Sequence, residues 1–365
     1  MLIIQGFLEK MVNDGASDLF IKAGVPPSLR VDGQVVQIDH GPLASEQVHE
    51  IAYEMMNEEQ RERFEDDFEM DLAVAVGGLG RFRVNLFRQR GTVGLVLRHV
   101  PYPEFDFEDL NLPPAVKMLS ERRRGLVLVT GTTGSGKSTT LAAMMNHINQ
   151  TRRCHIMTVE DPIEFIHSDA RSIVCQREIG IDTKSFGDSL RHVLRQSPDV
   201  ILIGEMRDLE TIGTAVAAAE TGHLVFSTLH TTDAVQTIER IINYFPLEGR
   251  DQIRMELALT LQGVVSQRLL PKAEGKGRIP ATEIMIVTAT IKKLLYEGRT
   301  LELREYIADG GHIGMMTFDQ CLLRLYHNKL IALEEAMGHA TSPDEFRQAA
   351  EGISSGVKAK NIAAY

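Results

Sequence analysis

The residues best suited to chemistry in this chain of 365 residues form a glycine-rich stretch at 131–139. It fits the pattern G-x-x-x-x-G-K-[S/T], in which glycines let consecutive backbone N–H groups curl around a phosphate. Lys137 would reach the β- and γ-phosphates of a nucleoside triphosphate, and the Ser138 hydroxyl would ligate Mg²⁺. The stretch therefore predicts a loop that binds ATP and Mg²⁺. Its candidate ATP-binding residues are Thr132, Thr133, Gly134, Ser135, Gly136, Lys137, Ser138 and Thr139.

The segments on either side of this loop support the prediction. Leu126–Val129 is a short apolar run, which is typical of a buried parallel strand. After the loop, Leu141, Met144, Met145 and Ile148 recur at the spacing of one helical face. The order strand, loop, helix aims the amino end of the helix at the bound anion.

Three further apolar runs alternate with helical segments at Ile156–Val159, Val200–Ile203 and Leu224–Phe226. This alternation predicts an α/β fold with a mainly parallel sheet and helices on its faces. In such sheets ligands bind at the carboxyl ends of the strands. Residues that follow these runs are therefore candidates for the site.

Polar residues follow each of the three runs. Glu164 comes shortly after the first, Glu205 follows the second with one glycine between them, and His230 comes after the third. Each acid taken alone could be a helix cap or a solvated loop residue. Together, beside a phosphate loop, they favour a hydrolytic site, where water must be activated and phosphate charge neutralised.

Composition limits the other possible functions. The net charge of −11 disfavours a general nucleic-acid binder, which usually carries positive charge. The three cysteines include no C-x-x-C pair, so we expect neither a zinc ribbon nor a disulfide framework. A reduced, cytoplasmic compartment fits this usage. We expect no signal peptide and no direct membrane span, since no apolar run approaches about 20 residues.

Residues 1–100 predict a smaller α+β domain. Arg81–Phe87 alternates apolar and polar residues and places Arg83 on the polar face. Thr92–His99 runs back as a neighbouring strand and carries Arg98. These arginines could simply solvate the sheet face, or they could contact an anionic ligand.

The rest of the chain divides into three predicted parts. The stretch 101–114 holds four prolines and should be an extended, stiff linker that could act as a hinge. From 115 to 353 we expect the α/β domain, ending in helices and loops after Gln267. The tail 354–365 is predicted to be disordered.

Four segments together resemble the Walker A, Asp, Walker B and His boxes of the secretion ATPase superfamily. They are Gly131–Thr139, Thr158–Glu164, Asp199–Asp208 and Glu220–Thr231. The likeness extends over nearly the whole chain and is greatest for the type IV pilus retraction ATPases, the PilT/PilU family. It implies a RecA-like P-loop ATPase domain preceded by a PAS-like N-terminal domain.

The resemblance also implies an activity and roles for individual residues. A hexameric motor would hydrolyse ATP to ADP and phosphate and use the energy to withdraw pilin subunits, as in twitching motility. Glu164 would polarise the attacking water, Glu205 would act on Mg²⁺ through a water, and His230 would sense the γ-phosphate. Arg83 and Arg98 would reach the nucleotide bound by the next subunit of the homo-hexamer.

Two features favour retraction over pilus assembly or type II secretion. The chain starts at the smaller domain, where assembly ATPases usually carry an extra one. In addition, Arg268–Gly275 lacks the four cysteines of their zinc insertion. The stretch Thr290–Glu297, however, departs from the A-I-R-N-L-I-R-E motif of retraction motors, with Lys292 and Tyr296 in place of arginines.

This departure leaves open an accessory PilU-like subunit that supports a principal motor, and an assembly or type II secretion ATPase remains a further alternative. The partners implied are an inner-membrane pilus platform protein and possibly a second retraction ATPase, with no nucleic acid. The implied location is cytoplasmic and peripheral, at the inner face of the bacterial inner membrane.

Overall fold

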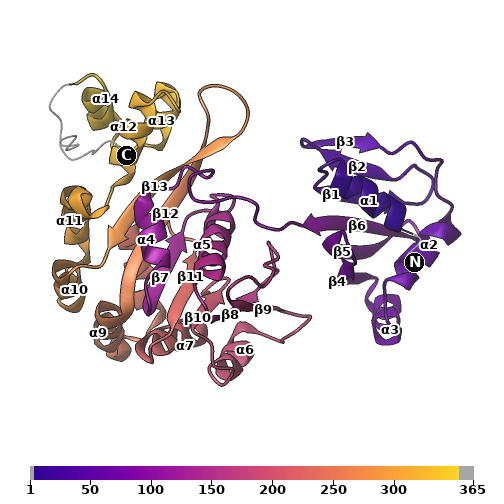
Figure 1. The fold of residues 1–365 in the computed structure, drawn as a ribbon, viewed down its shortest axis with the longest axis horizontal. Coiled ribbons are helices and arrows are strands. Elements are labelled where there is room, and N and C mark those ends of the chain that lie inside the picture. Colours follow the sequence, from indigo (N-terminus) through magenta and orange to yellow (C-terminus); the bar gives the residue numbers. More distant parts are fainter. Residues whose placement is uncertain (1–3, 353–365) are drawn as a thin grey trace. The chain divides into compact units, whose positions relative to one another are not determined.

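The computed structural model describes residues 4–352, which fall into two compact units (Figure 1). The first unit contains the chain up to Tyr102 together with Glu164–Ile166, and the second contains the remainder. Each unit has its own hydrophobic core. The α/β fold class predicted from the alternating apolar runs is confirmed. The predicted disordered tail lies outside the described residues.

The first unit is built on a six-stranded antiparallel sheet with the order β3-β2-β1-β6-β5-β4. Its helix α1 packs against β1, α2 packs against β1 and β6, and α3 packs against β4. The predicted alternation is confirmed, because Phe82, Val84 and Leu86 are all buried. The elements are α1 (Gln5–Asn13), β1 (Asp18–Lys22), β2 (Ser28–Val31), β3 (Gln34–Gln37), α2 (Ser45–Glu54), α3 (Glu58–Asp67), β4 (Glu69–Val76), β5 (Gly80–Gln89) and β6 (Thr92–Val100).

The second unit is built on a seven-stranded sheet with the order β13-β12-β7-β11-β10-β8-β9. All neighbouring strands are parallel except the edge pair β12 and β13. Its strands are β7 (Gly125–Thr130), β8 (His155–Glu160), β9 (Ile173–Glu178), β10 (Val200–Ile203), β11 (Leu224–Leu229), β12 (Leu261–Pro271) and β13 (Arg278–Ile286).

Helices cover the faces of this sheet, and the last ones form a small core of their own with β12 and β13. The α-helices are α4 (Pro114–Ser120), α5 (Lys137–Thr151), α6 (Phe186–Val193), α7 (Leu209–Glu220), α8 (Ala234–Tyr244), α9 (Arg250–Thr260), α10 (Ala289–Tyr296), α11 (Leu303–Asp309), α12 (Phe318–His327), α13 (Leu333–His339) and α14 (Pro343–Ala350). Short 3₁₀ turns are η1 (Leu247–Gly249), η2 (Thr300–Glu302) and η3 (Gly310–Ile313).

The expectation of helices and loops after Gln267 is wrong for two segments. The end of β12 and all of β13 are strands that pair with each other from Gly263 to Ile286. β13 is buried at all but two of its residues, whereas in the end of β12 only Leu270 is buried. A strand buried on both faces loses the alternation of apolar and polar residues, so its periodicity does not distinguish it from a buried helix.

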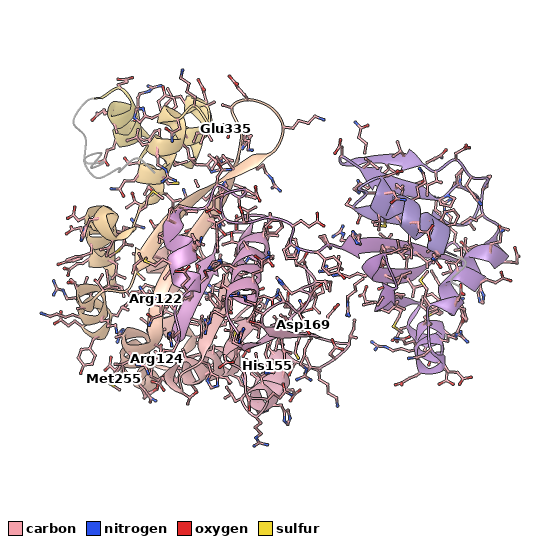
Figure 2. The ribbon with its side chains drawn as sticks, in the orientation of Figure 1. Arg122, Arg124, His155, Asp169, Met255 and Glu335 are labelled. Carbon is pink, nitrogen blue, oxygen red and sulfur yellow. The ribbon has the colours of Figure 1, made fainter. Side chains whose placement is uncertain are left out.

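Because the central strands are parallel, their carboxyl ends all lie at the same end of the sheet. Figure 2 labels Arg124, which directly precedes β7, and His155, the first residue of β8. Both lie at the lower edge of the sheet in this view, as the amino ends of parallel strands must. The candidate site therefore lies at the opposite end of these parallel strands, where β7, β10 and β11 terminate.

Candidate functional site

The glycine-rich loop connects the end of β7 at Thr130 to the start of α5 at Lys137. Its first residue, Gly131, has a φ of +147°, a backbone conformation that residues with a side chain rarely adopt. A Cβ atom there would lie 2.4 Å from Ser135 Oγ and 2.5 Å from the carbonyl oxygen of Gln267. Only glycine fits at this position, because the loop closes tightly on itself and on β12.

Lys137 turns its side chain into the loop. Its Nζ donates hydrogen bonds to the carbonyl oxygens of Gly131 (2.9 Å) and Thr132 (3.0 Å). Burial lowers the pKa of Lys137, although the nearby carboxylate of Glu205 acts in the opposite direction. The ammonium group is therefore positioned where a phosphate in the loop would meet it.

A second buried polar group tests whether the loop suits a phosphate. Ser135 Oγ is buried and has no hydrogen-bond partner within residues 4–352. A buried hydroxyl without a partner is costly, and a phosphate oxygen would satisfy it. The other predicted loop residues Thr132, Thr133, Gly134 and Ser138 are exposed, and Gly136 and Thr139 are half-buried. The residues present therefore fit a polyphosphate.

The same residues fit Mg²⁺ only as part of a nucleotide complex. In the described part of the chain, no group of three or more His, Cys, Asp or Glu side chains could hold a metal ion. Mg²⁺ commonly takes one or two protein oxygens together with substrate phosphates and waters. The exposed Ser138 hydroxyl in the first turn of α5 is suited to be one such ligand.

Two of the residues predicted at strand ends are brought together by the sheet. Glu205 Oε2 lies 2.8 Å from Arg207 Nη2 and 3.3 Å from His230 Nε2. Burial raises the pKa of Glu205, but the bonds to Arg207 and His230 outweigh it and hold the pKa below its usual range. Glu205 is consequently ionised at neutral pH, and its charge also acts on Lys137.

Backbone contacts between neighbouring strands fix this arrangement. β10 and β11 pair in parallel, so the segments that follow them leave the sheet side by side. Thr228 Oγ1 donates to the carbonyl oxygen of Gly204 at 2.7 Å, and the Met206 N–H donates to the Thr228 carbonyl oxygen at 3.1 Å. These two bonds flank Glu205 and hold it beside His230.

The other three predicted residues lie in the first unit. Glu164 Oε1 is 3.1 Å from Arg83 Nη2, so these two predicted residues form an ion pair. Arg98 Nη2 is 2.8 Å from Asp18 Oδ1, and Asp18 also pairs with Arg30. Burial raises the pKa of Asp18, but hydrogen bonds from Arg98 and Ser17 and the two arginine charges outweigh it and lower the pKa.

Sequence reasoning overlooked two residues of this arrangement. Arg207 lies in the segment that resembles the Walker B box, and a cation two residues after a strand-end acid is a signal that the sequence contains. Asp18 holds Arg98 and Arg30 through cross-strand pairing in the sheet. That contact depends on strand register, which local pattern does not show.

Comparison with known proteins gives concordant results. Residues 1–356 match the family model for the type II/IV secretion system protein. The type IV pilus retraction ATPase PilT of Pseudomonas aeruginosa is 49% identical over 91% of this chain and 96% of its own length. The type IV pilus ATPase PilU of the same organism is 46% identical over 93% of this chain and 89% of its own. A crystal structure of the pilus retraction motor PilT with bound ADP superimposes with a TM-score of 0.87 at 45% identity, covering 95% and 99% of the two chains.

Proposed function

This chain belongs to the type II/IV secretion system protein family, and we propose that it hydrolyses ATP to power retraction of type IV pili. The observation that carries the proposal is the position of Glu205 and His230 beside a phosphate loop that contains Lys137. Such a set of residues suits phosphoryl transfer, where catalysis depends on positioning and on charge stabilisation.

Each residue has a distinct part in the proposed reaction. The loop from Thr132 to Thr139 holds the phosphates, and Lys137 neutralises charge on the transferred group. Ser138 and, through a water, Glu205 would hold Mg²⁺, which supplies charge neutralisation at the phosphate oxygens when it is bound. His230 would contact the γ-phosphate, and Glu164 would orient the attacking water.

The remaining assignments concern the assembly. Arg83 and Arg98 would reach the nucleotide of the next subunit in a homo-hexameric ring. The ring would work in the cytoplasm, at the inner face of the inner membrane, on a pilus platform protein. A second retraction ATPase would be a further partner, and nucleic acid would not. No helix within residues 4–352 is long and apolar enough to cross a bilayer.

A direct test is the ATPase rate of purified protein carrying Glu164→Ala. If Glu164 orients the attacking water, kcat should fall by about 100-fold or more. Glu220→Ala, an exposed acid at the end of α7, is the matched control and should keep the wild-type rate. Equal rates for Glu164→Ala and wild type would remove the catalytic assignment.

A second candidate function is that of an accessory subunit for a principal retraction motor. It is favoured by the 46% identity to PilU and by α10, where Lys292 and Tyr296 stand at positions for which the resemblance to retraction motors implies arginine, and where Tyr296 is exposed. This function predicts that Lys137→Ala leaves pilus retraction unchanged in cells, whereas deletion of α10 and the helices after it abolishes retraction. If Lys137→Ala also abolishes retraction, the chain acts through its own hydrolysis.

A further inference from the structure

Four buried hydroxyl groups connect the strand that precedes the phosphate loop to the segment that carries His230. Ser266 Oγ lies 2.8 Å from Thr130 Oγ1, and Thr130 Oγ1 lies 3.5 Å from Thr237 Oγ1. Thr237 Oγ1 in turn lies 2.7 Å from Thr231 Oγ1. Each of these four side chains is buried. They come from β12, β7, α8 and the loop after β11, so the chain of hydroxyls crosses four separate segments.

Thr237 is the residue at which this series of hydroxyl groups branches. Its hydroxyl has one proton, which it donates to the carbonyl oxygen of Asp233 at 2.7 Å. With that proton committed, its oxygen accepts the hydrogen bond from Thr231, and Thr130 Oγ1 lies 3.5 Å away, at the limit of hydrogen-bonding distance, where it could only donate. One side chain thereby ties the first turn of α8 to two other segments.

The start of α8 is itself anchored, so Thr237 projects from a fixed position. The Ala234 N–H donates to Glu283 Oε1 of β13 at 2.9 Å, and Asp233 caps the helix by accepting from the Gln236 N–H at 2.8 Å. The segments held by Thr237 end next to the site. Thr130 directly precedes the phosphate loop, and Thr231 directly follows His230.

We propose that Thr237 is a positioning residue for ATP hydrolysis, because its hydroxyl holds Thr231, and with it His230, in place relative to the phosphate-loop strand. The inference rests on the proposed role of His230. The phosphate loop has its own contacts through Lys137 and Gly131, so it should bind nucleotide without this hydroxyl. Loss of the hydroxyl should therefore lower kcat while leaving nucleotide affinity nearly unchanged.

The test compares Thr237→Val, which keeps the shape of the side chain and removes its hydroxyl, with Thr237→Ser, which keeps the hydroxyl. In steady-state ATPase assays of the full-length protein, Thr237→Val should lower kcat about tenfold, as expected for a displaced catalytic group. KM for ATP and the affinity for a fluorescent ADP analogue should change by less than about twofold. Thr237→Ser should restore kcat. Wild-type kcat in Thr237→Val would overturn the inference.

A double-mutant cycle with His230→Ala separates positioning from a general structural effect. If Thr237 acts through His230, Thr237→Val should change kcat little in the His230→Ala background. An undiminished tenfold loss there would overturn the inference but leave the role of His230 intact. Wild-type kcat in His230→Ala alone would overturn the proposed role of His230, and the positioning with it. If Thr237→Val melts below the assay temperature, Thr231→Val deletes the same hydrogen bond from its other side and gives the same test.

Discussion

At the residue scale, the tight closure of the phosphate loop depends on Gly131. In Gly131→Ala the new Cβ would meet Ser135 Oγ and the Gln267 carbonyl oxygen at 2.4 and 2.5 Å, with φ at +147°. We expect a loss of about 3 kcal/mol in the free energy of unfolding, from backbone strain and overpacking together. Urea denaturation of the purified wild-type and Gly131→Ala proteins measures this difference in the free energy of unfolding.

Gly134→Ala is the matched control for that change. Gly134 also has a positive φ, of +78°, but a Cβ there would meet no atom within 4 Å. Its substitution should therefore cost only the backbone strain, about 1 kcal/mol. Equal losses in the two variants would show that the contacts of Gly131 with Ser135 and Gln267 are unimportant.

The charge of Glu205 interacts both with Arg207 and His230 at the strand ends and with Lys137 in the phosphate loop. Glu205→Gln keeps the size of the side chain but removes the charge that pairs with Arg207 and acts on Lys137. We expect kcat to fall by about 10- to 100-fold, as is usual when an outer-shell partner of a metal is lost. Glu210→Gln, which removes a carboxylate paired with Arg191 in an exposed position, should leave kcat unchanged. Comparable losses in both variants would contradict a specific role for Glu205.

At the scale of elements, the sequence predicted those parts whose signals are local. The loop and helix around Lys137 follow from one motif and one helical face, and the buried parallel strands from short apolar runs. β13 was not predicted, since burial on both faces removes the alternation. The hydroxyl contact of Thr130 with Ser266 joins residues 136 positions apart, so only strand register reveals it. Thus the parts of the site formed by residues close in sequence were predictable. The contacts that depend on how distant strands pair were not.

β13 also carries a buried acid that should make stability depend on pH. Burial raises the pKa of Glu283 to about 7, with a further increase from Asp233 and opposing effects from the Ala234 N–H, Arg304 and Arg268. Because the folded-state pKa exceeds the unfolded one, this group's contribution to stability is fully present below about pH 4.5 and is lost as pH rises through 7. Between pH 5 and pH 8 the loss should be about 2 kcal/mol.

Glu283→Gln tests this dependence because an amide oxygen can still accept from the Ala234 N–H but does not titrate. The urea midpoint of the wild-type protein should decrease between pH 5 and pH 8 more steeply than that of Glu283→Gln. Parallel pH profiles for the two proteins would mean that Glu283 does not titrate in this range when folded.

At the scale of the whole molecule, the two units separate the predicted residues into two groups. Lys137, Glu205 and His230 belong to the second unit, whereas Glu164, Arg83 and Arg98 belong to the first. In a closed ring of head-to-tail contacts, a residue of one subunit can complete the site of its neighbour. If the arginines act on the nucleotide of a neighbouring subunit, rings that mix two inactive variants should regain activity. Sites completed within one subunit would not regain it.

Lys137→Ala and Arg98→Ala proteins should each lack ATPase activity, and rings assembled from equal amounts of both should regain it. An intact site needs Lys137 from one subunit and Arg98 from the next, so random mixing leaves about a quarter of the sites complete. Arg98 suits this test because its side chain is 61% exposed and its partner Asp18 keeps Arg30 when Arg98 is removed. Activity near a quarter of the wild-type rate, measured after the two proteins are unfolded and refolded together, supports catalysis across the subunit boundary. Mixed rings as inactive as their parents would mean that Arg98 and Lys137 must act within one subunit, because only a site completed by a neighbour can be restored by mixing.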